Sequence, residues 1–221
     1  MSKRQTKPKV PVLVGVGGES PTNGAEDLVA AVAPYIAKIR IRGVCPILFR
    51  RWNCEEVEEK AKAKKGSDIK KQFIPENCIW RDDKKFMCIP GEYFRQSLIT
   101  AAKFVSDPRS PRKSAKDLFT AGLIIEEELS PILVQGKKIT TWDYVDKRRV
   151  MVQRNGITRE RPALNKGWEA EFLVLVNLSE YVSRELLGRV VFDAGRLAGL
   201  ADFRPSYGRY ETVSFEVLAY H

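Results

Sequence analysis

The prediction of the fold starts from the segment YIAKIRIRG, residues 35–43. In this segment apolar residues alternate with basic ones: Ile36, Ile39 and Ile41 stand against Lys38, Arg40 and Arg42. Alternation with a period of two is typical of a strand that is buried on one face only. We therefore expect a half-buried strand here, with a basic open face.

Further elements follow from apolar spacing along the chain. The Pro90–Gly91 turn precedes a segment whose apolar residues share one helical stripe, which predicts a helix that ends near Asp107–Pro108. This stripe consists of Phe94, Leu98, Ala101, Ala102 and Val105. Residues 108–117 are rich in proline and basic residues and are expected to form a mobile loop, while 122–129 and 130–134 have the composition of strands.

The C-terminal third of the chain predicts a strand, a helix and a strand. WEAEFLVLVNL (168–178) alternates like a strand, Ser179 can cap a helix that runs to about Gly195, and RYETVSFEVL (209–218) forms the last strand. In that last strand we expect a shared face for Val213, Phe215 and Val217. The overall order is β-α-β-β-α-β, which predicts an α+β, ferredoxin-like core of the kind seen in RNA-recognition motifs.

We divide the chain into a basic N-terminal arm and extension, 1–34, and one domain, 35–221, with insertions at about 51–87 and 130–167. In the first insertion, residues 54–65 are expected to form an exposed helix that is capped by Asn53. In the second, Asn155–Gly156 is a turn signal between RVMVQ and ITRER. The two flanking arms carry little apolar surface, so we expect a β-hairpin that projects from the core.

The net charge of +10 is concentrated in two places. Residues 1–9 contain four basic residues and no acidic one, and residues 137–166 contain nine basic residues against three acidic ones. Localised positive charge points to a polyanionic partner, most often a nucleic acid. The alternative is a charged surface that only maintains solubility.

Several function classes lack the residues they need. The cysteines Cys45, Cys54, Cys78 and Cys88 are not spaced as zinc ligands, and we expect free thiols, no metal and no cofactor. The one histidine is the last residue, His221, where it is rarely held rigidly. No apolar run approaches the about 18 residues that span a bilayer, so we expect no membrane association and a cytoplasmic location.

Two segments that follow one another along the chain are IRIRGVCPILF (39–49), a strand and a turn, and FMCIPGEYFRQSLITAAKF (86–104), a proline-glycine turn and a helix. They resemble the first strand and turn, and the proline-glycine turn and first helix, of the RAMP superfamily of CRISPR-associated proteins. RRVMVQRNGITRERPALNKGWEAEF (148–172) resembles the thumb-like hairpin and third strand of the backbone subunits, and 179–218 the C-terminal signature, although Ala201 stands where a glycine is expected. The resemblance covers about residues 36–218. It implies a subunit that assembles head to tail on single-stranded guide RNA, with other effector subunits as further partners.

Binding a single strand without reading its sequence needs basic groups for phosphates and flat groups on which bases stack. The residues expected to contact phosphate are Arg40, Arg42, Arg50, Arg51, Arg95, Arg148, Arg149, Arg154, Arg159, Arg161, Arg196, Arg204 and Arg209. Those expected to stack or wedge are Trp52, Phe203 and Tyr207, while Trp142 and Trp168 either contact RNA or belong to the core. Each arginine has the alternative of a solvated surface group, and for Arg95 this is a surface salt bridge.

The loop before the last strand contributes one wall of the expected RNA groove. Its small residues, Gly208 among them, would let backbone amides approach phosphates, and Arg204 and Arg209 would add charge. Because it leads into a strand next to residues 35–43, we expect it to lie beside Arg40 and Arg42.

Catalysis is the competing hypothesis. RNA-cleaving subunits of the resembled superfamily use an aspartate in the loop after the first strand, and GVCPILFRRWNCEE (43–56) contains none. We therefore expect a non-catalytic RNA-binding backbone subunit. The alternatives are a metal-dependent ribonuclease of the same superfamily and a mobile-element protein that mimics or inhibits a CRISPR subunit.

Overall fold

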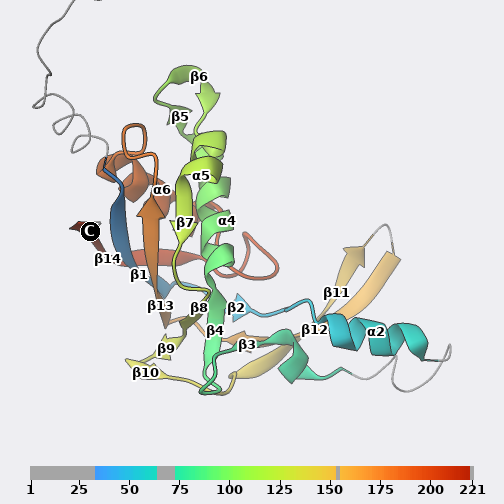
Figure 1. The fold of residues 1–221 in the computed structure, drawn as a ribbon. Coiled ribbons are helices and arrows are strands. Elements are labelled where there is room, and N and C mark those ends of the chain that lie inside the picture. Colours follow the sequence, from blue (N-terminus) through green and yellow to red (C-terminus); the bar gives the residue numbers. More distant parts are fainter. Residues whose placement is uncertain (1–32, 64–72, 153–154, 220–221) are drawn as a thin grey trace, which may run out of the picture. The chain divides into compact units, whose positions relative to one another are not determined.

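The centre of the structure is an antiparallel sheet in which β1 (Tyr35–Gly43) lies between β13 (Trp168–Val176) and β14 (Tyr210–Ala219) (Figure 1). This computed structural model describes residues 33–63, 73–152 and 155–219. The other edge of β13 pairs with β7 (Leu123–Ile125) and β9 (Leu133–Val134), and β9 pairs with β10 (Lys137–Lys138). The strands expected at 35–43, 168–178 and 209–218 are confirmed.

One face of this sheet is covered by α4 (Gly91–Ala101) and α6 (Arg184–Leu197), which contact each other. A short 3₁₀ turn, η2 (Ala102–Phe104), continues α4. The ring of Phe94 in α4 stacks on Phe172 of β13, with the ring centroids 4.4 Å apart. Every member of the apolar stripe predicted for residues 94–105 is buried. The amphipathic helix predicted after Pro90 is therefore confirmed.

The order of elements along the chain matches the order that the sequence predicts. It runs β1, α4, β7, β13, α6 and β14, which is strand, helix, strand, strand, helix, strand. Across the sheet, these strands lie in the order β14–β1–β13–β7, and each pair of neighbours is antiparallel. The fold is α+β, with the apolar core between the sheet and the two helices.

A β-bulge changes the faces of the last strand. The register between β1 and β14 shifts after Arg40, and Val213, which has no partner in the ladder, is 41% exposed. Phe215 and Val217 pack against the core. The prediction of one face for all three was wrong at Val213, because the extra residue of a bulge interrupts the period of two. In β1, Ile36 shares the open face with the basic residues and not the buried face.

Two other local predictions were wrong. Residues 108–117 were expected to form a mobile loop. Instead they belong to a small hairpin of β5 (Ser106–Asp107) with β6 (Ser110–Ser114) and to the start of α5 (Lys116–Gly122). Helix α6 is capped by Ser183, whose hydroxyl accepts a hydrogen bond from the Leu186 amide at 3.2 Å, and not by Ser179.

The first insertion contains the expected exposed helix. Helix α2 (Cys54–Lys62) is capped by Asn53, whose side-chain oxygen accepts from the Glu56 amide at 3.2 Å. The remaining elements are β2 (Ile47–Leu48), η1 (Pro75–Cys78), β3 (Trp80–Arg81) and β4 (Met87–Pro90), which pairs with β8 (Leu129–Pro131). Helix α2 ends at Lys62 with Ala63 as its C-cap, earlier than the end predicted at residue 65, and residues 64–72 lie outside the described residues.

The second insertion is the predicted hairpin, formed by β11 (Tyr144–Val152) and β12 (Asn155–Leu164). The end of β12 pairs with β2, and the two arms extend away from the sheet beside α2 (Figure 1). Asn155 and Gly156 belong to the strand, opposite Val152 and Met151, so the predicted turn position was wrong. Residues 153–154 and the basic arm at 1–32 lie outside the described residues.

Candidate nucleic-acid interface

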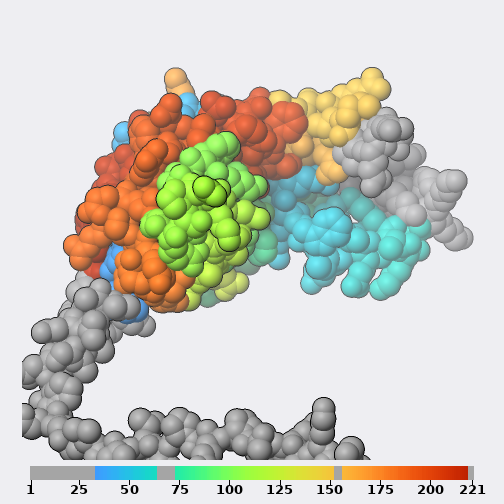
Figure 2. Space-filling view, turned by 90° about the horizontal axis from the view of Figure 1, so that it is seen from above, coloured from blue at the N-terminus to red at the C-terminus, as the bar shows by residue number. Residues whose placement is uncertain are grey.

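A basic cavity of about 490 Å³ lies between the hairpin and the first insertion, and we call it the hairpin–helix cleft. Pairing of β12 with β2 places the hairpin beside the residues that follow β2, and the Phe49 amide donates to the Pro162 carbonyl at 2.9 Å. In Figure 2, β11 in yellow and residues 50–62 in cyan lie at the same end of the molecule. The basic residues that line the cleft are Arg50, Arg51, Lys60, Lys147 and Arg159.

The charges in this cleft are only partly neutralised. Lys60 pairs with Glu56, and Lys147 pairs with Glu160 at 2.6 Å. Arg50 and Arg159 have no ion pair within the described ranges. Excess positive charge therefore faces the cavity, as binding of a phosphate requires.

The pKa of Arg159 reports the same imbalance. Burial lowers this pKa below its ordinary value, and the positive charges of Arg50 and Arg161 lower it further, while Asp202 offsets this only in part. A bound anion would relieve this repulsion. Of the arginines proposed from the sequence, the structure brings Arg50, Arg51 and Arg159 together at this cleft. Arg51 also forms no ion pair among the described residues, but its guanidinium carbon lies 4.3 Å from the centroid of the Trp80 ring.

Trp52 follows Arg51 of the cleft lining in sequence, directly before the cap of α2, and is 73% exposed. An indole in that position offers a flat apolar face on which a base can stack. The hairpin adds exposed apolar side chains that sequence reasoning missed, Met151 at 66% and Ile157 at 37% exposed. The signal that could have found them is an apolar residue in an otherwise basic, projecting hairpin.

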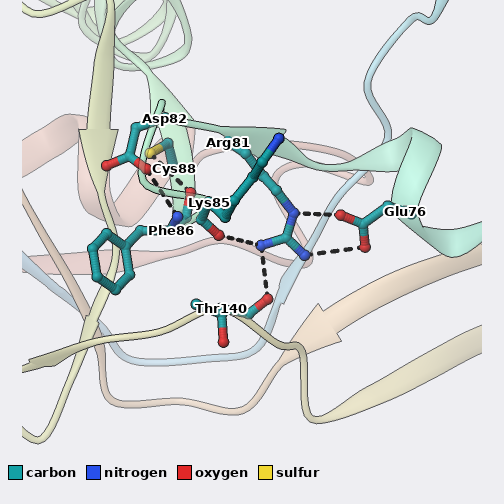
Figure 3. A network of polar contacts seen from close by, with 7 residues as sticks. All are labelled: Glu76, Arg81, Asp82, Lys85, Phe86, Cys88 and Thr140. Atoms are coloured by element: carbon teal, nitrogen blue, oxygen red, sulfur yellow. Dashed lines mark hydrogen bonds and ion pairs between the residues drawn. The ribbon is translucent and has the colours of Figure 1, made fainter.

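Arg81 holds η1, whose Cys78 lines the cleft, in a network of polar contacts (Figure 3). Its guanidinium pairs with Glu76 in η1 and donates through Nη1 to the Lys85 carbonyl at 2.6 Å and the Thr140 carbonyl at 2.7 Å. The Arg51 amide donates to the Cys78 carbonyl at 2.9 Å at the end of η1. These bonds tie η1 to the segment before the hairpin, so the cleft has a braced wall.

Four proposed RNA contacts instead bind one another at the hairpin base. The Arg161 side chain, from a residue only 3% exposed, donates through Nε to Asp202 Oδ2 at 2.5 Å. Arg148 donates to the Tyr207 hydroxyl at 2.7 Å and pairs with Asp146. Phe203 packs under both guanidiniums, 5.1 Å from Arg148 and 5.2 Å from Arg161.

This cluster fastens the hairpin to the loop that follows α6. Hydrogen bonds to Asp146 and then to Tyr207 raise the pKa of Arg148, which is the shift of a charged group that already has strong acceptors. Both residues thus hold the hairpin in place within the protein, and their role as phosphate contacts stays a prediction.

The loop before β14 uses its backbone amides within the protein. Leu200 N donates to the Gly208 carbonyl at 2.9 Å, Asp202 N to the Leu48 carbonyl at 3.0 Å and Gly208 N to the Pro46 carbonyl at 2.8 Å. Gly208 has φ +71°, and a Cβ there would lie 2.0 Å from the Leu200 carbonyl oxygen. The glycine thus permits close packing. These amides already have partners within the protein, and a role of the loop in phosphate binding stays a prediction.

The positive charges on the open face of the sheet are also paired with carboxylates. Glu169 accepts from both Arg40, through Nε at 3.0 Å, and Arg42, through Nε at 2.8 Å. Lys38 pairs with Glu171 on the same face at 3.2 Å. Burial favours the neutral form of Glu169, but the two guanidiniums outweigh it and lower the pKa of that carboxyl. Arg40 and Arg42 are therefore engaged in a local ion-pair cluster.

The other proposed contacts are scattered. Arg95 donates to the carbonyls of Leu123 at 3.1 Å and Thr120, so it joins α4 to α5 and β7 and is not available to a phosphate. Trp168 is buried and donates to the Cys45 carbonyl at 3.0 Å, which places it in the core. Four other proposed contacts are exposed at separate places: Arg149 on β11, Arg196 over the Phe192 ring on α6, and Arg204 and Arg209 in the loop before β14. Trp142 packs against the core, and Arg154 is outside the described residues.

No helix in residues 33–63, 73–152 and 155–219 is long and apolar enough to cross a membrane. Within the same ranges, no three histidine, cysteine or acidic side chains are grouped so that they could hold a metal ion. The four cysteines are free thiols, as the sequence predicts.

No protein-family model matches the chain, and no curated protein matches it. Among solved structures, it is similar to a chain of the "Cryo-EM structure of the Type III-B Cmr-beta bound to cognate target RNA", with 9% sequence identity and a TM-score of 0.46. The match covers 89% of this chain and 65% of that chain, so this chain spans under two thirds of its length. The function has to be argued from the residues of this chain.

Proposed function

We propose that this chain binds single-stranded RNA in the hairpin–helix cleft. The observation that carries the proposal is that Arg50 and Arg159 line one cavity and form no ion pair among the described residues. Trp52, which follows Arg51 of the cleft lining in sequence, is exposed and can supply a surface for a base. A basic groove with an adjacent aromatic face is the combination that binds a strand through phosphates and stacking, with no requirement for sequence.

The identity that fits this activity is a guide-RNA-binding backbone subunit of the RAMP superfamily, in which copies assemble head to tail and contact other effector subunits. Support comes from the resembling segments and from the order of elements β1, α4, β7, β13, α6 and β14, which we interpret as a ferredoxin-like core. We interpret the projecting hairpin as the thumb that the resemblance implies.

We propose no catalytic step. The loop after β1 contains no aspartate, which is the residue that the resembled RNA-cleaving subunits use there. Labelled RNA incubated with excess protein and Mg²⁺ is expected to stay intact. Cleavage that increases with protein concentration would contradict this part of the proposal.

The binding site is tested with the double variant Arg50→Ala/Arg159→Ala, by fluorescence anisotropy of a labelled single-stranded RNA over a range of salt concentrations. The matched control is Arg112→Ala/Arg189→Ala, which removes the same charge from exposed positions on β6 and α6. Each lost phosphate contact should reduce the slope of log K against log salt by about 0.7. Equal affinity and slope for both double variants would overturn the assignment of the cleft.

A further inference from the structure

A groove of about 750 Å³ lies between α4 and the β7–β8 segment, and it shares no lining residue with the hairpin–helix cleft. Its apolar and aromatic side chains come from β3, α4, β7 and β8, and Ile124 among them is 46% exposed. These residues are Trp80, Tyr93, Ile124, Ile125 and Leu129. We call this cavity the α4–β7 groove. Apolar surface that is exposed in a hollow of this size is typical of a binding site.

The lining of the α4–β7 groove is acidic, although the chain carries a net charge of +10. It contains four glutamates against one basic residue, Arg95. Arg95 donates to two backbone carbonyls and lies 3.5 Å from a carboxylate oxygen of Glu92, so its charge is already engaged. Glu126 and Glu128 are exposed and form no ion pair among the described residues. Free carboxylates attract a basic partner and repel phosphate groups, so the groove does not suit RNA.

The backbone of β7 is open on the side that faces away from β13. In the part of the chain that the structure describes, β7 pairs with no strand other than β13. The Gly122 carbonyl accepts from the Asn177 amide at 2.9 Å. The Glu126 amide donates to the Leu173 carbonyl at 3.0 Å. Since backbone groups alternate along a strand, the even-numbered residues from 122 to 126 direct theirs at β13, and the odd-numbered residues between them direct theirs outward.

The two outward-facing residues of β7 differ in what their backbone groups contact. The Leu123 carbonyl accepts from Arg95 Nε at 3.1 Å, which closes the strand edge at that end. The Ile125 amide and carbonyl point away from the β7–β13 ladder, and the described residues provide no other partner for them. An unpaired strand edge is a template to which an extended segment of another chain can add through main-chain hydrogen bonds. The open part of the edge lies directly before Glu126 and Glu128, so a segment that adds there passes the free carboxylates.

We propose that the α4–β7 groove binds an extended segment of a different protein, one that alternates apolar and basic residues and adds as a strand to β7. One residue of that segment exchanges both main-chain hydrogen bonds with Ile125. Because successive side chains of a strand point to opposite faces, its apolar face packs on the apolar lining while its basic face meets Glu126 and Glu128. The groove and the hairpin–helix cleft have separate linings, so the chain can hold this segment and RNA at the same time.

A labelled synthetic peptide of alternating leucine and lysine is the probe, and fluorescence anisotropy measures its affinity for the full chain. Glu126→Lys/Glu128→Lys should weaken binding by more than about tenfold, because charge reversal places like charges opposite each other. The matched control is Glu58→Lys/Glu59→Lys, which makes the same change at exposed residues of α2 and should bind as the unaltered protein does. A peptide of alternating leucine and glutamate should not bind. Equal losses in the two double variants would show that the peptide responds only to net charge, and this would overturn the proposal.

Hydrogen exchange followed by NMR tests the addition of a strand. The Ile125 amide should exchange more than about tenfold more slowly when the peptide is bound, whereas the Ile124 amide, which already faces β13, should change little. Unchanged exchange at Ile125 in the bound state would overturn strand addition. A dimer of the chain that dissociates in the ultracentrifuge when the peptide is added would place a second copy in the groove and overturn the assignment to a different protein. Arg50→Ala/Arg159→Ala should bind the peptide normally, so the proposed RNA site and this groove fail or stand separately.

Discussion

Arg161 and Asp202 form an ion pair of 2.5 Å between residues that are 41 positions apart, and it joins the base of the hairpin to the loop after α6. Arg161 is buried, and one of its two terminal nitrogens, Nη1, has no hydrogen-bond partner among the residues that the structure describes. The neighbouring basic residue on the same strand, Arg159, faces the hairpin–helix cleft. Two arginines in one basic run thus have different roles.

The first prediction concerns the partners of this ion pair. Asp202→Ala leaves a buried guanidinium without its counter-charge and should lower the free energy of unfolding by about 3 kcal/mol. Arg161→Met removes both the charge and an unsatisfied donor, so it should cost far less. Urea denaturation measures both. Asp193→Ala, which removes a pair of 4.0 Å on the surface of α6, is the control and should change stability by under about 1 kcal/mol. A larger loss in Arg161→Met than in Asp202→Ala would contradict the assignment.

The order of elements could be predicted because its signals are local. Alternation in residues 35–43 and 168–176, and the apolar stripe from Phe94 to Val105, each depend on neighbours within one element. The bulge at Val213 and the cap at Ser183 depend on how the last strand and helix meet the rest of the sheet. No spacing rule within either segment contains that information.

The sequence predicts which segment of the candidate site is basic, but not which of its arginines are paired within the protein. The sequence identifies the hairpin as basic, but Arg161 is buried because Asp202 and Phe203 reach it from a distant loop. Arg40 and Arg42 are compensated because β13 places Glu169 opposite them. Such pairings are fixed by tertiary contacts, which a count of charges along the chain does not reveal.

The second prediction tests stacking by Trp52. Because this side chain is 73% exposed, Trp52→Ala should leave the unfolding transition unchanged while it weakens binding of single-stranded RNA by about 1–3 kcal/mol. Trp52→Phe should retain most of the affinity. The matched control is Phe104→Ala, which removes another largely exposed aromatic ring from a residue that follows α4 in the chain. If both alanine variants bind RNA as the unaltered protein does, Trp52 does not stack a base.

The third prediction concerns acid stability. The pKa of Glu169 is lowered from its ordinary 4.5, since the hydrogen bonds from Arg40 and Arg42 outweigh the effect of burial. A carboxyl with a depressed pKa in the folded state contributes stability above the unfolded value and loses it as the pH falls through the folded value. Glu169→Gln should therefore be less stable at neutral pH and lose less stability than the unaltered protein below about pH 4.5. Glu216→Gln, on the neighbouring strand of the same face, is the control. Parallel curves of stability against pH for Glu169→Gln and the unaltered protein would rule out this contribution.

The fourth prediction separates two reasons for glycine. Gly208 and Gly136 both have positive φ, +71° and +76°, so alanine costs about 1 kcal/mol of backbone strain at either position. At Gly136 a Cβ would meet nothing within 4 Å, whereas at Gly208 it would lie 2.0 Å from the Leu200 carbonyl oxygen. Gly208→Ala should therefore destabilise the protein considerably more than Gly136→Ala, as measured by urea denaturation. The same clash would shift the loop that carries Asp202 and Phe203 and loosen the hairpin base, so Gly208→Ala should also weaken RNA binding. If Gly208→Ala and Gly136→Ala are equally stable, the loop has room for a Cβ at Gly208, and close packing against Leu200 is not the reason for this glycine.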